Sequence, residues 1–497
     1  LLTHAHIDHS GRIPKLCLDG FAGPIYATKA TTELCAIMLP DSGHIQEMEA
    51  EWANRKNQRA GHTQVLPMYT MMDAQNCMKY FKKVSYGELL DLAPGVRARF
   101  NDAGHILGSS IIELWIKEDD GKETKIVFSG DLGNKNMPIM RDPQIIISAD
   151  YLVIESTYGN RLHNHNDKVE RFVNIICDTI NRGGNVIIPS FAVGRTQEVI
   201  YALHKEREKY GGSMEKCLNI PVFVDSPLAV SATKVFRDNL DCYDEEARQY
   251  IENGDNPLDF PGLQFTTSVD DSKALNAREG SSVIISASGM CDAGRIKHHL
   301  KHNLWRSEST ILFVGYQAQG TLGRRLVDGA KTVRIFGEEI TVNARIEMLE
   351  GFSGHADHKG LMDWIAAFQN KPRQIFIVHG EGEAMTEFSS SIIDEFGIKT
   401  IIPSKGEAFL STDNVMVLDD TKISREIKSG LPGVRKLAMV DLLDNLSADF
   451  YALSGKLKRR LKDEMSEWDL DELTTRLQKL QTTVTAVSGS VSSGSVV

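Results

Sequence analysis

Metal-binding side chains crowd into the start of the chain, where the sequence reads His4-Ala5-His6-Ile7-Asp8-His9. Neutral imidazole nitrogens and carboxylate oxygens are donors that Zn²⁺ accepts. In an extended segment, alternation places His4, His6 and Asp8 on one side and turns His9 away. One metal ion cannot readily use all four side chains in that geometry, so the string indicates two metal ions side by side. Because only 15 of 497 residues are His, chance explains this spacing poorly.

Further ligand-type residues follow apolar, β-rich runs elsewhere in the chain. His105 precedes a Gly-Ser-Ser turn, Asp131 follows a predicted strand over 125–128, and His379 follows a predicted strand over 374–378. Each lies beside Gly at the end of a strand, where a sheet presents side chains to a cleft. Alone, a His or Asp in this position is usually a turn or cap residue. Together with the first string, these residues complete a set that can hold two metal ions.

This ordered set of motifs resembles the metallo-β-lactamase-fold hydrolases. The resemblance implies that one zinc ion is held by His4, His6, His105 and Asp131. It implies a second zinc ion held by Asp8, His9, Asp131 and His379, with Asp131 bridging. Two metal ions about 3.5–4 Å apart can lower the pKa of a shared water and neutralise charge on a phosphate. Mn²⁺ is the alternative metal.

A narrower resemblance is to the β-CASP branch of that fold, whose three extra motifs match Glu155, His355 and His379. It covers roughly residues 1–412, with seven segments in the family's order. It implies an α/β fold, in which an αββα metallo-β-lactamase sandwich carries an inserted β-CASP domain with a mostly parallel sheet. The branch comprises nucleases, chiefly of RNA. A histidine in the third extra motif is typical of its RNA-acting members.

Within this resemblance, His355 is the candidate general acid for the leaving oxygen, a role that contributes about 10²–10⁴-fold to a rate. Glu155 would orient the imidazole and favour its protonated form. Asp8 completes the catalytic set. The alternative for His355 is a loop histidine bonded to Asp357, and the alternative for Glu155 is a carboxylate at a helix N-terminus.

The formal net charge of −11 means that a nuclease must concentrate positive charge locally. Residues 272–334 contain ten Lys or Arg and four Asp or Glu, and Arg295 and Lys297 begin the densest part. We expect this stretch to contact backbone phosphates of single-stranded RNA, and a solvated helix surface is the alternative. Ser190, Arg195 and Ser353 are further candidates for phosphate contacts, with turn or cap roles as the alternative.

The chain divides by pattern into five parts. We predict a first metallo-β-lactamase segment at 1–159, a β-CASP domain at 160–353, a second metallo-β-lactamase segment at 354–412, a helical extension at 413–486 and a disordered tail at 487–497. Strands alternate with helices in the second part, which predicts parallel strands with right-handed crossovers. Apolar residues at helical spacing over 441–482 predict a hairpin that docks on the core or forms a homodimer. Related proteins have strands before the first motif, so the chain resembles an N-terminally truncated fragment with an exposed sheet edge.

Composition indicates where the protein works. No run of 18 apolar residues occurs, so we expect no membrane span. Seven scattered cysteines without a Cys-x-x-Cys pair predict reduced thiols in a cytoplasmic protein.

The sequence therefore favours a zinc-dependent ribonuclease of the endonuclease type, the 5′–3′ exonuclease type, or both. A DNA-acting relative is one alternative, and a hydrolase of thioesters, lactams or lactones is another. The large insertion and the Glu155–His355 pair favour a nuclease. A catalytically inactive RNA-binding scaffold is a further alternative, although every ligand position is filled.

Overall fold

The computed structural model describes residues 1–60, 63–118, 121–163, 168–209, 217, 219–349, 351, 353–412 and 415–418. The chain forms two compact units, Leu1–Pro403 and Ser404–Val497. In the second unit, β18 (Phe409–Thr412) and β19 (Val415–Leu418) form an antiparallel hairpin. The predicted helices within 441–482 and the tail at 487–497 lie outside the described residues.

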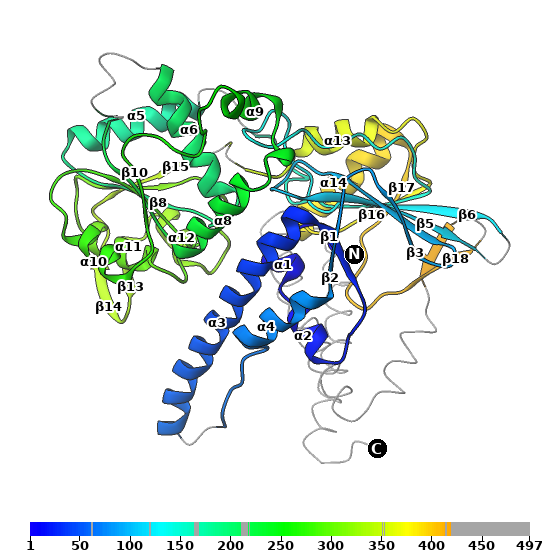
Figure 1. The fold of residues 1–497 in the computed structure, drawn as a ribbon, viewed down its shortest axis with the longest axis horizontal. Helices are drawn as coiled ribbons and strands as arrows, with labels where there is room; N and C mark the ends of the chain where they lie inside the picture. Colours follow the sequence, from blue (N-terminus) through cyan, green and yellow to red (C-terminus); the bar gives the residue numbers. More distant parts are fainter. Residues whose placement is uncertain are drawn as a thin grey trace, which may run out of the picture. The chain divides into compact units, whose positions relative to one another are not determined.

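The first sheet of the first unit has seven strands in the order β17-β16-β7-β6-β5-β4-β3 (Figure 1). They are β3 (Leu89–Ala93), β4 (Val96–Asp102), β5 (Ser110–Lys117), β6 (Glu123–Phe128), β7 (Tyr151–Ile154), β16 (Gln374–Ile377) and β17 (Lys399–Ile401). Strands β3 to β6 pair antiparallel, whereas β6, β7, β16 and β17 pair parallel. Apolar residues of α13 (His358–Ala366) and α14 (Gly382–Phe396) pack on β7 and β16 in one core. The carboxyl ends of β6, β7 and β16 therefore meet at one edge.

The second sheet has six strands in the order β10-β9-β11-β8-β12-β15, and every neighbouring pair is parallel. They are β8 (Val186–Pro189), β9 (Val222–Asp225), β10 (Leu263–Thr266), β11 (Val283–Ser286), β12 (Thr310–Phe313) and β15 (Arg345–Met348). All residues of β8, β9, β11 and β12 are buried, as expected for parallel strands covered on both faces. The predicted alternation of parallel strands and helices is confirmed.

Helices cover both faces of this second sheet. One face shares its core with α5 (Lys168–Asn181), α6 (Arg195–Lys209) and α8 (Pro227–Arg237). The other face packs on α10 (Val269–Ala277), α11 (Ile296–Asn303) and α12 (Leu322–Val327). Alternation along β8 explains the division, because Val186 and Ile188 enter the first core and Ile187 enters the second.

The remaining elements frame the two sheets. They are α1 (Ile7–Ser10), α2 (Ile13–Leu18), β1 (Ile25–Thr28), α3 (Lys29–Ala60), α4 (Met71–Cys77), η1 (Met78–Tyr80), β2 (Phe81–Val84), η2 (Leu240–Cys242), α9 (Glu245–Glu252), β13 (Thr332–Ile335) and β14 (Glu338–Thr341). Strands β1 and β2 pair parallel, and β13 and β14 form an antiparallel hairpin. Contacts between the two sheet regions include a hydrogen bond of 2.8 Å from the Asp244 backbone nitrogen to the Ile139 carbonyl.

Two expectations from the sequence are corrected here. The chain turns helical at Ile7, so Asp8 and His9 lie in α1 and do not continue the extended alternation of His4 and His6. Cys177 and Cys217 form a disulfide, so the seven cysteines are not all reduced thiols. No helix in the described part of the chain combines the length and apolar character that crossing a bilayer requires.

Candidate metal centre

All seven predicted metal ligands meet at one edge of the seven-stranded sheet. The ligand atoms of His4, His6, His105 and Asp131 lie within 4.8 Å of one another. The same limit holds for Asp8, His9 and His379. The family resemblance implied the same two groups, except that it also assigned Asp131 to the second one.

Asp131 lies between the two groups. Its Oδ2 atom is 3.4 Å from His4 Nε2, 3.3 Å from His9 Nε2 and 3.7 Å from His105 Nε2. Its Oδ1 atom is 3.7 Å from His379 Nδ1. The carboxylate therefore has imidazoles of both groups within 3.7 Å, as a ligand shared by two ions requires.

The strand ends explain why these distant residues converge. Asp131 follows β6, Glu155 follows β7 and His379 follows β16, and these three strands are parallel neighbours. His379 adopts a left-handed backbone conformation with φ 54°, which L residues rarely adopt and which is common at functional sites. The sheet thus delivers side chains from segments more than 200 residues apart to one place.

Glycine permits the close approach of the loops that carry His105 and Asp131. A Cβ atom on Gly133 would overlap the backbone carbonyl of Gly104. The Gly133 backbone nitrogen also donates to the Ala103 carbonyl at 2.7 Å. The loop after β6 therefore lies directly on the loop after β4.

We expect Gly133→Ala to separate these two loops and to weaken metal binding. The overlap is with backbone, which cannot move aside cheaply, so the free energy of unfolding should fall by about 1–3 kcal/mol. Metal titration and thermal unfolding of the variant measure both effects. Gly315→Ala is the matched control, because Gly315, like Gly133, does not have a positive φ, and nothing lies near its Cβ position. Unchanged metal affinity in Gly133→Ala would show that the loop contact does not position the ligands.

Buried polar atoms without partners point to a cation at this place. His4 Nε2, His105 Nδ1 and Asp131 Oδ1 are buried and have no hydrogen-bond partner among the described residues. Two pairs of imidazole nitrogens also face each other, His6 Nδ1 with His105 Nε2 at 3.2 Å and His9 Nε2 with His379 Nε2 at 3.1 Å. Nitrogen lone pairs that converge in this way repel unless a proton or a cation lies between them.

The protonation states favour a metal over protons. Burial lowers the pKa of His4, lowers the pKa of His6 to about 3 and lowers the pKa of His105 well below its usual value. Burial alone would raise the pKa of Asp131, but the imidazoles of His4 and His9 beside it hold it well below its usual range. Neutral imidazoles around an ionised carboxylate are the donor set of a zinc site. His4, His6, His105 and Asp131 therefore fit a divalent metal ion. In the second group the hydrogen bond with Asp8 raises the pKa of His379 to about 9, so a metal ion there would displace that proton.

His355 and Glu155 form a pair beside this cluster. His355 Nδ1 lies 3.2 Å and 3.1 Å from the two carboxylate oxygens of Glu155. Burial lowers the pKa of His355, but the charge and hydrogen bond of Glu155 outweigh it, so the pKa is raised overall. The His355 ring centroid is 4.4 Å from that of His105. Asp357 instead caps α13 by accepting from the Gly360 nitrogen, so His355 is not the Asp357-bonded loop histidine considered as an alternative.

The predicted phosphate contacts already have partners within the protein. Ser190 is buried and accepts from the Thr196 hydroxyl at 3.1 Å, and Arg195 pairs with Glu198. Ser353 accepts from the His355 backbone nitrogen at 3.3 Å. Lys297 donates to the Asp292 carbonyl at 3.1 Å. A role for these four residues in phosphate binding stays a prediction.

Arg295 belongs to a buried network around Asp225, the last residue of β9. Asp225 accepts hydrogen bonds from Arg295 Nη1 at 2.7 Å, His299 Nε2 at 2.6 Å and the Thr266 hydroxyl at 2.6 Å. Burial alone would raise the pKa of Asp225, but hydrogen bonds, the largest from His299, hold it well below its usual range. The guanidinium of Arg295 is thus held by the protein itself.

We expect Asp225→Asn to lower the free energy of unfolding by about 3 kcal/mol, the low end of the cost of breaking a buried pair. Arg295 keeps carbonyl partners, which limits the loss. Because the folded pKa is below the unfolded value of about 3.9, the contribution is complete above that pH and is lost progressively as the pH falls from there toward the folded pKa. Chemical denaturation between pH 2 and pH 7 should therefore show a shallower acid loss in the variant. If the free energy of unfolding fell equally with decreasing pH in the wild type and the variant, Asp225 would not have this role.

Sequence reasoning missed Thr157, which sits two residues after Glu155. Its hydroxyl lies 3.1 Å from His379 Nδ1, while His379 Nε2 faces Asp8 Oδ2 at 3.3 Å. The hydroxyl therefore orients the imidazole, as groups behind metal ligands commonly do. Its only signal in the sequence was its place beside Glu155 in a strand-end loop.

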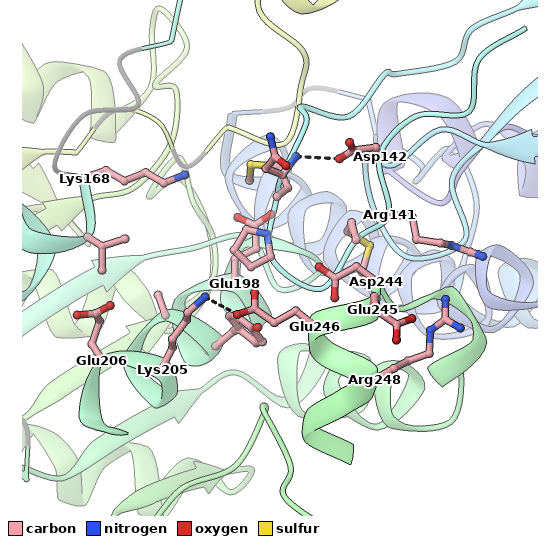
Figure 2. A pocket seen from close by; sticks show the side chains of 17 residues that line it. Arg141, Asp142, Lys168, Glu198, Lys205, Glu206, Asp244, Glu245, Glu246 and Arg248 are labelled. Atoms are coloured by element: carbon pink, nitrogen blue, oxygen red, sulfur yellow. Dashed lines mark hydrogen bonds and ion pairs between the residues drawn. The ribbon is translucent and has the colours of Figure 1, made fainter. Parts of the chain in front are cut away.

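Two cavities border the candidate metal ligands, and a third lies away from them. One of about 430 Å³ is bordered by His6, Ile7, Ile45, Phe191 and Arg295 and is mostly apolar. Another of about 220 Å³ is bordered by Thr157, Tyr158, Tyr316 and His379. A third, of about 680 Å³, lies elsewhere (Figure 2), between the 136–142 loop and helices α6 and α9. Charged side chains line it, and Lys205 pairs there with Glu246. The size of this cavity therefore does not mark the reaction site.

Comparisons with known proteins agree with this geometry. The Beta-Casp domain model matches residues 196–326, and the model of a Zn-dependent metallo-hydrolase RNA specificity domain matches residues 339–403.

The chain is also similar to individual proteins. It is 36% identical over 386 residues to Ribonuclease TTHA0252 of Thermus thermophilus, and this match covers 78% of this chain and 81% of that protein. It is 33% identical over 425 residues to Transcription termination factor FttA of Thermococcus kodakarensis, which covers 82% of this chain and 61% of that protein. The FttA of Methanocaldococcus jannaschii is 30% identical over 419 residues, with 82% and 62% covered. The chain thus spans about three fifths of these two archaeal proteins.

Proposed function

We propose, since this chain belongs to the β-CASP family of metallo-β-lactamase-fold nucleases, that it hydrolyses phosphodiester bonds of single-stranded RNA with two divalent metal ions. The observation that carries this proposal is the position of Asp131. It is a buried carboxylate with imidazoles of both ligand groups within 3.7 Å. Zinc is the expected metal, with manganese as the alternative.

The residues would divide between two ions in the way their distances suggest. His4, His6 and His105 would hold one, Asp8, His9 and His379 the other, and Asp131 would contact both. Two such ions supply an activated water and neutralise the charge that builds on the phosphate. Thr157 would hold the orientation of the His379 ring. The exposed carboxylate of Asp8 would offset part of the positive charge of the two ions.

His355 would protonate the leaving oxygen. Its Nδ1 is bonded to Glu155, so Nε2 is the nitrogen that can give a proton to the substrate. The buried Glu155 carboxylate also accepts from the Leu132 backbone nitrogen at 2.6 Å, which fixes its position. A fixed carboxylate stabilises the imidazolium and holds the ring toward the cluster.

RNA is the expected substrate for two reasons. One relative is named a ribonuclease, and one matching family model is described as an RNA specificity domain. The two cavities that include His6 and His379 adjoin opposite ligand groups and could hold nucleotides on either side of the reacting phosphate. Their confined size favours a flexible single strand. The cytoplasm is the expected location, and a homodimer is the expected assembly if residues 441–482 associate.

The test uses linear RNAs with a 5′-monophosphate or a 5′-triphosphate, a circular RNA, and a DNA strand of the same sequence. We expect RNA cleavage that stops after chelation and returns with Zn²⁺ or Mn²⁺. Nicked circles indicate internal cutting, whereas mononucleotides from the monophosphate form alone indicate a 5′ exonuclease. Preferential cleavage of the DNA strand would make the protein a DNA-acting member of the family. Cleavage unaffected by chelation would refute the metal mechanism.

A further inference from the structure

Another group of metal-ligand side chains lies in the second sheet region, away from the cluster around Asp131. His204 and Glu208 are four residues apart on α6, so both point from the same face of the helix. Asp255 lies three residues beyond the end of α9. One ligand atom from each of the three residues lies within 4.8 Å of the other two. The pattern combines an imidazole and two carboxylates from elements that are separate in sequence.

Each side chain is held in position by a neighbour. His204 Nε2 and Asp255 Oδ2 are 2.9 Å apart, and the second oxygen of Asp255 accepts from the Asn256 backbone nitrogen at 2.8 Å. The Tyr250 hydroxyl donates to Glu208 Oε2 at 3.2 Å. Ligands of a tetrahedral Zn²⁺ lie about 3.3–3.6 Å from one another. A small rotation of the exposed Glu208 side chain would therefore complete that geometry.

The local charge favours a cation. The His204 side chain is 7% exposed, and its Nδ1 has no hydrogen-bond partner among the described residues. A neutral ring with its proton on Nδ1 leaves the Nε2 lone pair, which faces Asp255, free for a metal ion. The neighbouring cations have other partners, since Lys205 pairs with Glu246 and Arg207 bonds Asn219.

Aromatic side chains enclose the imidazole of this group. The rings of Tyr250 and Phe260 lie 5.5 Å and 6.4 Å from the His204 ring and shield it on two sides. Aromatic walls reduce screening by water, so the unbalanced carboxylates act strongly on a nearby cation.

We propose that His204, Glu208 and Asp255 bind a further divalent transition-metal ion of the Zn²⁺ class. The imidazole favours such an ion over Mg²⁺ or Ca²⁺, which prefer oxygen ligands alone. The ion ties α6 to the loop after α9 and leaves coordination positions for water. Its role is to hold this part of the second sheet region together, and it takes no part in the hydrolysis.

The experiment counts zinc ions per chain. The full chain is stripped with a chelator, reloaded by equilibrium dialysis against Zn²⁺ and analysed for metal content. We expect Glu208→Gln and Asp255→Asn to bind one equivalent fewer than the wild type, or to bind that equivalent at least tenfold more weakly. His298→Ala is the matched control, because His298 is an exposed histidine whose loss should leave the zinc content unchanged.

Thermal unfolding separates this proposal from a purely structural role. Glu208 is exposed, so Glu208→Gln should unfold like the wild type without metal but lose part of the rise in Tm that Zn²⁺ produces. Equal zinc content in the wild type and both variants would overturn the proposal. A lower Tm in Asp255→Asn, by the same amount with and without Zn²⁺, would instead show that His204 and Asp255 form only a hydrogen-bonded clamp.

Discussion

Asp131→Asn is expected to reduce RNA cleavage on the order of 10³-fold or more. The carboxylate of Asp131 has imidazoles of both ligand groups within 3.7 Å, and the residue is 2% exposed. An amide offers one oxygen and no charge, so both metal positions lose affinity together. Loss of several kcal/mol of charge stabilisation corresponds to this range, since each 1.36 kcal/mol is a factor of ten. Initial rates on single-stranded RNA at saturating metal measure the effect.

Asp363→Asn provides the matched control for this prediction. Asp363 also carries a carboxylate within an ion pair, but it lies on the surface of α13 and pairs with Lys359. Its loss should change neither the rate nor the metal content, because exposed pairs contribute little. If Asp131→Asn kept its metal ions and more than a tenth of the wild-type rate, Asp131 would not bridge the two ions.

His355→Ala is expected to lower the rate of RNA cleavage by about 10²–10⁴-fold while the metal content stays unchanged. His355 lies beside His105 and is bonded to Glu155, so it borders the cluster without belonging to either ligand group. Glu155→Gln should have a smaller effect in the same direction, because the ring keeps a hydrogen-bond partner but loses the charge that stabilises its protonated form.

The choice of substrate tests the acid role directly. A nitrophenyl phosphodiester releases a weakly basic phenolate that needs no proton, whereas RNA releases a strongly basic alkoxide. His355→Ala should therefore cleave the nitrophenyl ester nearly as fast as the wild type does. An equal loss on both substrates would mean that His355 positions the substrate or the metal ions and does not donate a proton.

The convergence of the seven candidate ligands was predictable because its signals are local and redundant. Each ligand follows an apolar strand or belongs to the first string, and parallel strands bring their ends to one edge. The helix that begins at Ile7 was not predictable from the sequence. It has only four residues, about one helical turn, so it shows no helical periodicity, and the alternation of ligand residues indicated an extended segment. The ligands converge nonetheless, since a helical turn also places Asp8 and His9 beside His379.

Long-range pairings explain the rest of what sequence reasoning missed. The partner of Arg295 is Asp225, 70 positions away, and only the folded sheet brings them together. The disulfide between Cys177 and Cys217 follows no spacing rule, because connectivity cannot be deduced from scattered cysteines. Thr157 acts through the ring of His379 across 222 positions. In each case the residue type was visible, but the contact depends on the tertiary fold.

Crystals of the zinc-loaded protein, measured on either side of the zinc absorption edge, test the central claim most directly. We expect two anomalous peaks that share Asp131, one beside His4, His6 and His105 and the other beside Asp8, His9 and His379. A single peak at this place, or no peak within bonding distance of Asp131, would contradict the paired metal centre and the hydrolytic function inferred from it.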